Sequence, residues 1–239
     1  MGCRALMIVC LLWLQYAYAN VEKVIFVAPA AEPLPTDASI DNLLLTPLSE
    51  QFPIARTHIN ASFPDKESPK GTETWLLLEG LHPKRRYEVR ICWMATQPTS
   101  FWLYTHTIDH AFSKPGLLTS LSTYAYSRHE RLGSEDIQQL QLRKTKPGPG
   151  EPESTFLFLQ VYAAADYFTL NQTLMENVPP VAVDIILDPY LLNVFPRSLL
   201  PTGLYLLLIA CGAWFISGQV ARLFTIQNIA ENDAEKKSK

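Results

Sequence analysis

Short apolar segments, several with alternating apolar and polar residues, follow one another between residues 20 and 107 and again between residues 154 and 187. After Tyr87, for example, Val89 and Ile91 fall on one face with the tyrosine, while Glu88 and Arg90 fall on the other. Proline, glycine, aspartate and serine separate the segments, as they do in an antiparallel β-sandwich. The expected strands are residues 21–27, 43–45, 54–63, 74–78, 87–94, 101–107, 154–163 and 181–187.

The pattern loosens between residues 107 and 154. Residues 134–142 predict a short helix with Ser134 as its N-cap. Residues 146–152, rich in proline and glycine, predict an exposed loop.

Two longer apolar runs stand near the ends of the chain. The first, residues 5–14, follows Arg4 and precedes Ala17 and Ala19, which is the three-part pattern of a secretory signal peptide. About ten apolar residues are too few to cross a hydrocarbon core of roughly 30 Å as a helix. We therefore expect residues 1–19 to be a cleaved signal peptide.

The second run, residues 199–218, predicts a transmembrane helix. About twenty helical residues at ~1.5 Å each match the thickness of the hydrocarbon core. The run has no polar face, which argues against a buried helix of a soluble domain. Together with the signal peptide, this helix predicts a lumenal β-rich domain at residues 20–198 and a cytosolic tail at residues 219–239.

The tail ends in two lysines, Lys236 and Lys237, at the fourth and third positions from the C-terminus. This placement resembles the dilysine signal by which coat proteins return type I membrane proteins to the endoplasmic reticulum. The alternative is an ordinary solvated charged tail. We expect a single-pass type I protein of the endoplasmic reticulum membrane, with coat proteins as partners of the tail.

Composition and charge limit the function classes. An apolar fraction of 48% with 18% charged residues fits a chain with a membrane-facing segment. The net charge of −3 gives no basic field for nucleic acid, so no nucleic-acid partner is expected.

Cysteine and asparagine residues bear on the lumenal compartment. Only Cys92 falls in the expected lumenal region, so no intrachain disulfide can form there, and Cys92 is either buried or bridged to another chain. Asn60 and Asn171 each begin an N-glycosylation motif and are candidate acceptors.

The segment with Leu81, Pro83 and Tyr87 has the spacing Leu-x-Pro-x-x-x-Tyr. It resembles the tyrosine corner of fibronectin type III domains, in which the tyrosine hydroxyl bonds back to the backbone of the corner. The alternative is a generic loop before a strand. With the strand pattern, the corner favours a mostly β fold: a lumenal antiparallel, fibronectin type III-like β-sandwich followed by one C-terminal transmembrane helix.

Motifs for catalysis are absent from the sequence: there is no glycine-rich phosphate loop, no Gly-x-Ser-x-Gly and no Cys-x-x-Cys. His106 and His110 could share a metal if they lay on one helix, but the expected strand at residues 101–107 places them on different turns of the chain. We expect no catalytic residue, no cofactor and no metal.

Residues 187–202, which lead from the last expected strand into the apolar helix, resemble the fungal co-activator family of GPI mannosyltransferase II. The resemblance implies a non-catalytic subunit that stabilises or positions a multi-span mannosyltransferase, the enzyme that adds the second mannose in GPI-anchor biosynthesis. It also implies that residues 188–218 contact this partner. The candidate contact residues before the helix are Asp188, Pro189, Tyr190, Asn193, Pro196 and Arg197.

Two other classes share parts of this arrangement. A cargo receptor of the p24 type has a similar size and a dilysine tail, but it should show a lumenal disulfide and a heptad coiled coil before the span. A translocon-associated subunit shares the lumenal sandwich and the single span, and the sequence leaves that alternative open.

Overall fold

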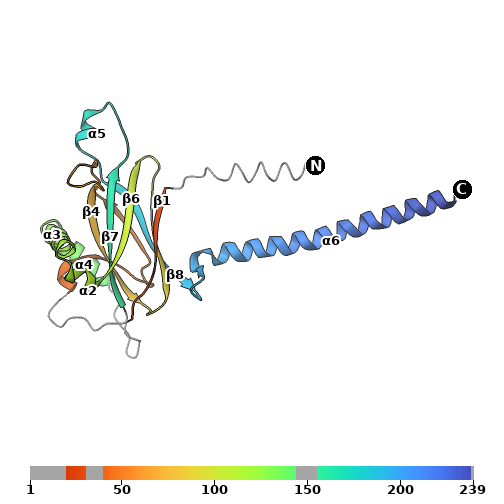
Figure 1. Ribbon diagram of the computed structural model, residues 1–239, viewed down its shortest axis with the longest axis horizontal. Coiled ribbons are helices and arrows are strands. Elements are labelled where there is room, and N and C mark those ends of the chain that lie inside the picture. The colour runs from red at the N-terminus through yellow and green to blue at the C-terminus, as the bar shows by residue number, and fades with distance from the viewer. Residues whose placement is uncertain (1–19, 31–39, 144–154, 238–239) are drawn as a thin grey trace. The chain divides into compact units, whose positions relative to one another are not determined.

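The computed structural model describes residues 20–30, 40–143 and 155–237, and for residues 223–237 it describes the backbone alone (Figure 1). The predicted signal peptide and the predicted loop at residues 146–152 lie outside the described residues. The chain forms two units, Met1–Val194 and Phe195–Lys239. Each unit is described by itself.

The first unit is a sandwich of two β-sheets. In the first sheet the strand order is β1 (Val21–Val27), β5 (Arg86–Trp93), β8 (Val181–Leu191) and β3 (Ile54–Ile59), with antiparallel neighbours throughout. In the second sheet it is β2 (Thr46–Leu48), β4 (Thr72–Leu81), β7 (Thr155–Ala165) and β6 (Thr99–Thr107), and β2 runs parallel to β4. The predicted mostly β class is confirmed.

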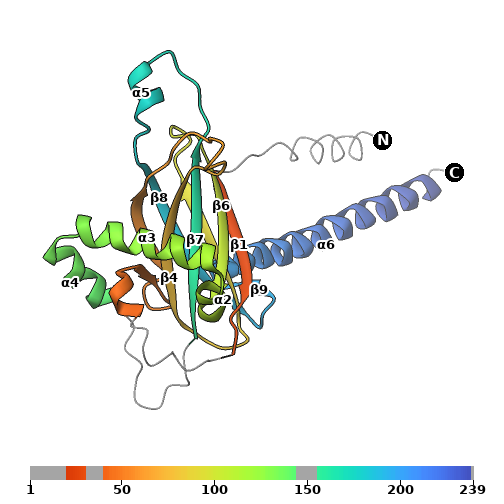
Figure 2. The ribbon, with the colours of Figure 1, turned by 60° about the vertical axis from the view of Figure 1, so that its left-hand side comes forward.

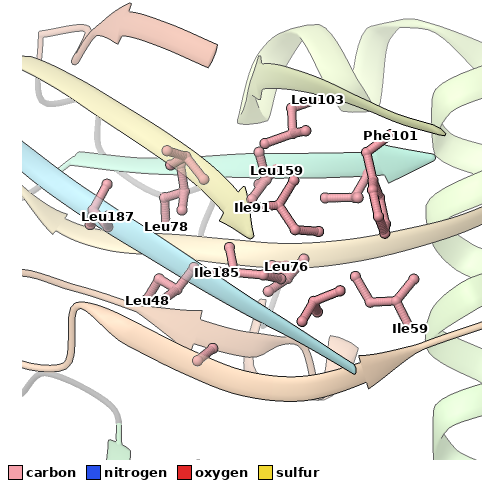
Figure 3. Close-up of a cluster of buried hydrophobic side chains, with 14 of the residues drawn as sticks. Leu48, Ile59, Leu76, Leu78, Ile91, Phe101, Leu103, Leu159, Ile185 and Leu187 are labelled. Carbon is pink, nitrogen blue, oxygen red and sulfur yellow. The ribbon is translucent and has the colours of Figure 1, made fainter. Parts of the chain in front are cut away.

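The main core lies between the two sheets (Figure 3). In β8, alternate residues Val183, Ile185 and Leu187 are buried in this core. They meet residues of the second sheet such as Leu76 and Leu159, which are also buried. The alternation seen in the sequence therefore corresponds to inward and outward positions of the strands.

A second core lies on the outer face of the second sheet, beneath helices. Three helices follow β6, namely α2 (Ile108–Ser113), α3 (Pro115–Arg131) and α4 (Ser134–Arg143). Figure 2 shows α3 crossing the strands of this sheet. The buried residues of this core are Ile40, Leu45, Trp75, Leu77, Ala111, Leu121 and Phe158. Because β4 and β7 are covered on both faces, both are buried in runs rather than at alternate positions.

The predicted elements fit the structure unevenly. The helix predicted at residues 134–142 is confirmed as α4. The strand predicted at residues 43–45 is wrong, because residues Ile40–Leu43 form a 3-10 helix, η2, and β2 begins at Thr46. The strand predicted at residues 54–63 ends earlier, at Ile59. Helices α2 and α3 were not predicted.

Strand β8 continues to Leu191, four residues beyond its predicted end. In these four residues Asp188 pairs with Glu88 and Pro189 pairs with Tyr87 of β5. The pairing of β8 with β3 ends at Ile186, so within this unit only β5 lies beside Pro189. A proline without an N–H is tolerated at such a position.

The sandwich has two distinct ends. At one end, Ile59 of β3 pairs with Val181 of β8, and helix α5 (Gln172–Glu176) lies in the connection between β7 and β8 (Figure 1). We call this the α5 end. At the other end, Tyr87 of β5 pairs with Pro189 of β8. We call this the corner end.

The second unit contains β9 (Phe195–Pro196), the 3-10 helix η3 (Arg197–Leu199) and α6 (Leu200–Lys237). The stretch Arg197–Arg222 has a mean hydropathy of 2.0, and its apolar side chains are exposed. It is long and apolar enough to cross a membrane. The helix continues through most of the expected tail.

Candidate functional site

Tyr87 anchors the corner end of the sandwich. It stands near the start of β5, where its ring is fully buried. Its hydroxyl accepts a hydrogen bond of 2.9 Å from the backbone N–H of His82 and donates one of 2.5 Å to Oε1 of Glu50. The first bond is the contact back to the corner that the segment with Leu81 and Pro83 led us to expect.

Arg85, in the turn before β5, bonds both to the loop that carries Glu50 and to the end of β8. Its Nη1 donates to both carboxylate oxygens of Glu50, at 2.9 and 3.1 Å, and its Nε donates to the carbonyl oxygen of Tyr190 at 3.3 Å. Burial, followed by the hydrogen bond to Glu50, raises the pKa of Tyr87 above its usual value. A tyrosine hydroxyl is protonated at neutral pH in any case, so the raised pKa lets Tyr87 keep donating to Glu50 at more alkaline pH as well.

Asn193 ties the loop after β8 to the turn before β5. Its Oδ1 accepts a bond of 2.8 Å from the N–H of Arg86, and its Nδ2 donates a bond of 3.0 Å to the carbonyl of Lys84. Positive φ angles, which residues other than glycine rarely adopt, occur at three positions here: Lys84, Leu192 and Asn193. An open cavity of about 510 Å³ lies between the turn and the loop.

The six candidate contact residues divide between the interior and the surface. Asp188 and Tyr190 are 4% and 7% exposed, and Pro189 is buried with them. Asn193 is exposed in the loop after β8. In the second unit, Pro196 is half-buried and Arg197 is exposed. The surface offered by these six residues is therefore smaller than the sequence suggested.

Two residues that hold the corner end together, Glu50 and Arg85, were missed by the sequence interpretation. Glu50 lies 37 residues before Tyr87 in the chain, so no local spacing connects them. Arg85 stands between two other basic residues, Lys84 and Arg86, and nothing in the sequence marks it as the one that pairs.

His106 lies on β6 and His110 lies on α2, so the two histidines do not share a helix, as the strand predicted at residues 101–107 implied. Helix α2 begins at Ile108, directly after β6, and this brings the two rings into a stack with centroids 5.6 Å apart. Nε2 of His106 lies 2.8 Å from Oε1 of Gln160. Among the described residues there is no group of three His, Cys, Asp or Glu side chains that could hold a metal ion.

A cavity of about 520 Å³, lined by both polar and apolar side chains, lies beside α3 and the strands β3 and β4. The arginine side chains that line it form hydrogen bonds with other residues of the chain. Arg128 donates to the carbonyl of Leu44 and to Oγ1 of Thr46, and Arg131 donates to Ser127. We assign no ligand to this cavity.

The remaining candidate residues lie apart from the corner end. Asn60 follows β3 and Asn171 is the N-cap of α5, so both exposed glycosylation candidates lie at the α5 end. Lys236 and Lys237 are the last two residues of α6. Cys92 is half-buried and free, and burial raises the pKa of its thiol.

We expect the substitution Tyr87→Phe to destabilise the fold by about 1–3 kcal/mol, because it removes the hydroxyl that bonds both the backbone N–H of His82 and the charged carboxylate of Glu50. Thermal unfolding of the full chain in detergent would measure the change. Tyr126→Phe is the control, since Tyr126 is exposed on α3. Equal melting temperatures for the two variants would contradict the structural role of the corner.

Comparison with known proteins identifies one family. Residues 12–126 match the family model Pga1, described as GPI-Mannosyltransferase II co-activator. The matched segment includes β1 to β6 and most of α3, and it therefore contains Tyr87 and Glu50. Searches of curated proteins and of solved structures found no match.

Proposed function

We propose that the chain, whose residues 12–126 match the co-activator family model of GPI-mannosyltransferase II, is a non-catalytic subunit of that enzyme. In this proposal it stabilises or positions the multi-span mannosyltransferase that adds the second mannose during GPI-anchor biosynthesis. The family match is the observation that carries the proposal.

The proposed topology is that of a single-pass type I protein of the endoplasmic reticulum. Residues 1–19 act as a cleaved signal peptide, residues 20–198 lie in the lumen, residues 199–218 cross the membrane and residues 219–239 lie in the cytosol. The apolar stretch Arg197–Arg222 supports the span.

Occupied sequons would test the orientation, because glycans are added in the lumen. Asn60→Gln and Asn171→Gln should each increase gel mobility if both sites are used.

The proposed partner contact runs along the exposed side chains of α6 within residues 200–218, together with Asn193, Pro196 and Arg197. Asp188, Pro189 and Tyr190 support this contact from the end of β8, where burial keeps them from a partner's surface. Packing between helices within a membrane does not require a polar face on either helix. The apolar surface of α6 is compatible with such packing.

The decisive experiment is to deplete the protein and to follow the lipid-linked GPI precursors by mannose labelling. We expect precursors with one mannose to accumulate, because the step that adds the second mannose loses its co-activator. A normal precursor profile would contradict the proposal. Affinity purification from detergent gives an independent result, since recovery of a translocon without a mannosyltransferase would favour the translocon-associated alternative.

A matched pair of variants would test the contact surface. Replacing residues 200–218 by an unrelated apolar helix of the same length should keep the protein in the membrane but lose co-purification of the mannosyltransferase. Asn171→Gln, at the α5 end, should leave co-purification unchanged. Retained co-purification by the helix replacement would place the contact elsewhere.

The proposed retrieval signal makes a further prediction. The double substitution Lys236→Ser with Lys237→Ser should let the protein leave the endoplasmic reticulum, because coat proteins would no longer bind the tail. Extension of the glycan by enzymes of the Golgi, seen as a lower gel mobility, would report the exit, provided that a sequon is occupied. Lys239→Ser is the control. Unchanged residence of the double variant would mean that the partner enzyme retains the protein.

A further inference from the structure

Four exposed side chains form what we call the corner tip: Lys84, Arg86, Leu192 and Val194. The side chains of Leu192 and Val194 are 97% and 76% exposed, although both are aliphatic. Lys84 and Arg86 are exposed beside them. The two hydrogen bonds of Asn193 connect the turn that carries the basic residues to the loop that carries the apolar ones.

The corner tip carries positive charge that the sandwich leaves uncompensated. Among the described residues, neither the Lys84 ammonium nor the Arg86 guanidinium forms an ion pair, and Arg86 lies over the ring of Tyr190 at 5.8 Å. The neighbouring Arg85 is neutralised by Glu50. The nearest acid on β5, Glu88, is buried and paired with Lys23.

The two ends of the sandwich differ in chemistry. Both sequons stand at the α5 end, next to the pairing of Ile59 with Val181. The corner end has no sequon among the described residues. A glycan is bulky and hydrophilic and would not fit against a lipid surface. A glycosylated α5 end is therefore unsuited to contact with lipid, whereas the corner end carries no such obstacle among the described residues.

The sequence connects the corner tip closely to the apolar stretch. Leu192 precedes Arg197, the first residue of that stretch, by only five residues. Five extended residues reach at most about 18 Å. A span that begins at Arg197 therefore keeps Leu192 within reach of the bilayer surface.

We propose that the corner tip docks on the leaflet that α6 enters, with Lys84 and Arg86 on lipid phosphate groups and with Leu192 and Val194 at the boundary between headgroups and acyl chains. The proposal rests on the membrane span of the proposed function. A lipid surface accounts for both features of the tip, because basic side chains bind anionic headgroups and aliphatic side chains enter the interface. It also explains why exposed leucine and valine side chains are held in a fixed loop.

A protein partner fits this surface less well. The exposed side chains of the tip are aliphatic and basic, whereas the main anchors of protein interfaces are enriched in tryptophan, tyrosine and arginine within well-packed pockets. Of these residue types, only Arg86 is exposed at the tip, and its guanidinium already lies on Tyr190. The short connection between Leu192 and the span at Arg197 also keeps the tip near the bilayer. Docking on lipid therefore does not require a large interface.

The test uses the full chain, reconstituted into lipid nanodiscs of phosphatidylcholine and phosphatidylinositol. In a background with the other cysteines replaced by serine, Leu192→Cys is labelled with a bimane fluorophore, and a lipid with a nitroxide on its headgroup serves as quencher. Leu170→Cys is the matched control, because Leu170 is 92% exposed at the α5 end. We expect strong quenching at position 192 and little at position 170.

Charge variants test the role of the basic residues. Adding Lys84→Gln should lower the ratio of docked to undocked chains about fivefold, as estimated for one basic residue at an anionic lipid surface. Lys66→Gln, an exposed lysine between β3 and β4, should leave the ratio unchanged. High salt should act like Lys84→Gln, because screening shortens the range of the attraction.

Three outcomes would overturn the proposal. Equal quenching at positions 192 and 170 would show that the tip does not touch lipid. Quenching that Lys84→Gln and salt leave unchanged would remove the role of the basic residues. If position 192 is shielded from the nitroxide only when the mannosyltransferase is present in the nanodisc, the tip would be assigned to a protein contact instead of a lipid contact. Failure of the chain to insert into nanodiscs would instead contradict the membrane span itself.

Discussion

Replacing Gly71 with alanine is expected to destabilise the sandwich by at least about 3 kcal/mol, the largest effect that we expect from a single added methyl group. Gly71 has a φ of +72° and directly precedes β4. A Cβ atom there would lie 2.2 Å from the carbonyl oxygen of Ala163 and 2.8 Å from Cα of Ala164. Both are backbone atoms of the paired strand β7, so no side chain can move aside.

The clash in Gly71→Ala would act on the pairing between β4 and β7, which begins at Thr72 and Ala163. Thermal unfolding of the full chain in detergent should show a fall in melting temperature of roughly 6 °C or more. Gly116→Ala is the control, because a Cβ on Gly116 in α3 would meet no atom within 4 Å. A similar melting temperature for Gly71→Ala and the unsubstituted protein would mean that this loop has another conformation.

The substitution Trp75→Ala is expected to destabilise the protein by about 3–5 kcal/mol and to detach α3 from the second sheet. Trp75 is fully buried, its ring meets Phe158 edge to face at 6.2 Å, and its Nε1 donates to Oγ of Ser120 at 3.2 Å. Ser120 lies on α3. Removing the indole would therefore leave a cavity and an unbonded hydroxyl beneath the helix.

Hydrogen exchange would separate the two consequences of Trp75→Ala. Amides of α3 should exchange much faster in this variant, while amides of β5 and β8 in the other sheet should change less. Trp75→Phe keeps most of the packing and loses the hydrogen bond, so we expect an intermediate effect. Tyr126→Ala, on the exposed face of α3, is the control. Unchanged exchange in α3 after Trp75→Ala would mean that other contacts hold the helix.

The helices over the second sheet show why part of the fold escaped prediction. Helix α3 has a sequence rich in serine and threonine, which favour helix interiors only weakly, and only Leu121 and Ala125 are buried. Its apolar periodicity is therefore faint. The helix is stabilised instead by packing on Trp75 and Phe158 of the sheet beneath it. This tertiary contact leaves no pattern in the sequence of the helix itself.

The corner end shows the same limit on a smaller scale. The spacing of Leu81, Pro83 and Tyr87 predicted a hydroxyl that bonds back to its own turn, and this contact is local. The bond from Tyr87 to Glu50 and the bond from the Arg86 N–H to Asn193 join residues 37 and 107 positions apart. Such partners depend on how strands meet in space, which no local pattern contains.

The sequence by itself determined most of the strands, the inward and outward positions along them and the apolar helix. These features are local, because a strand and a membrane-length helix each carry their own periodicity. Only the tertiary structure decided the strand order, because β3, β4, β5 and β6 alternate between the two sheets and the turns that join them do not encode a sheet. It also extended β8 through Asp188 and Tyr190, which are buried, whereas Leu192 and Val194 of the corner tip are exposed in the loop that follows β8.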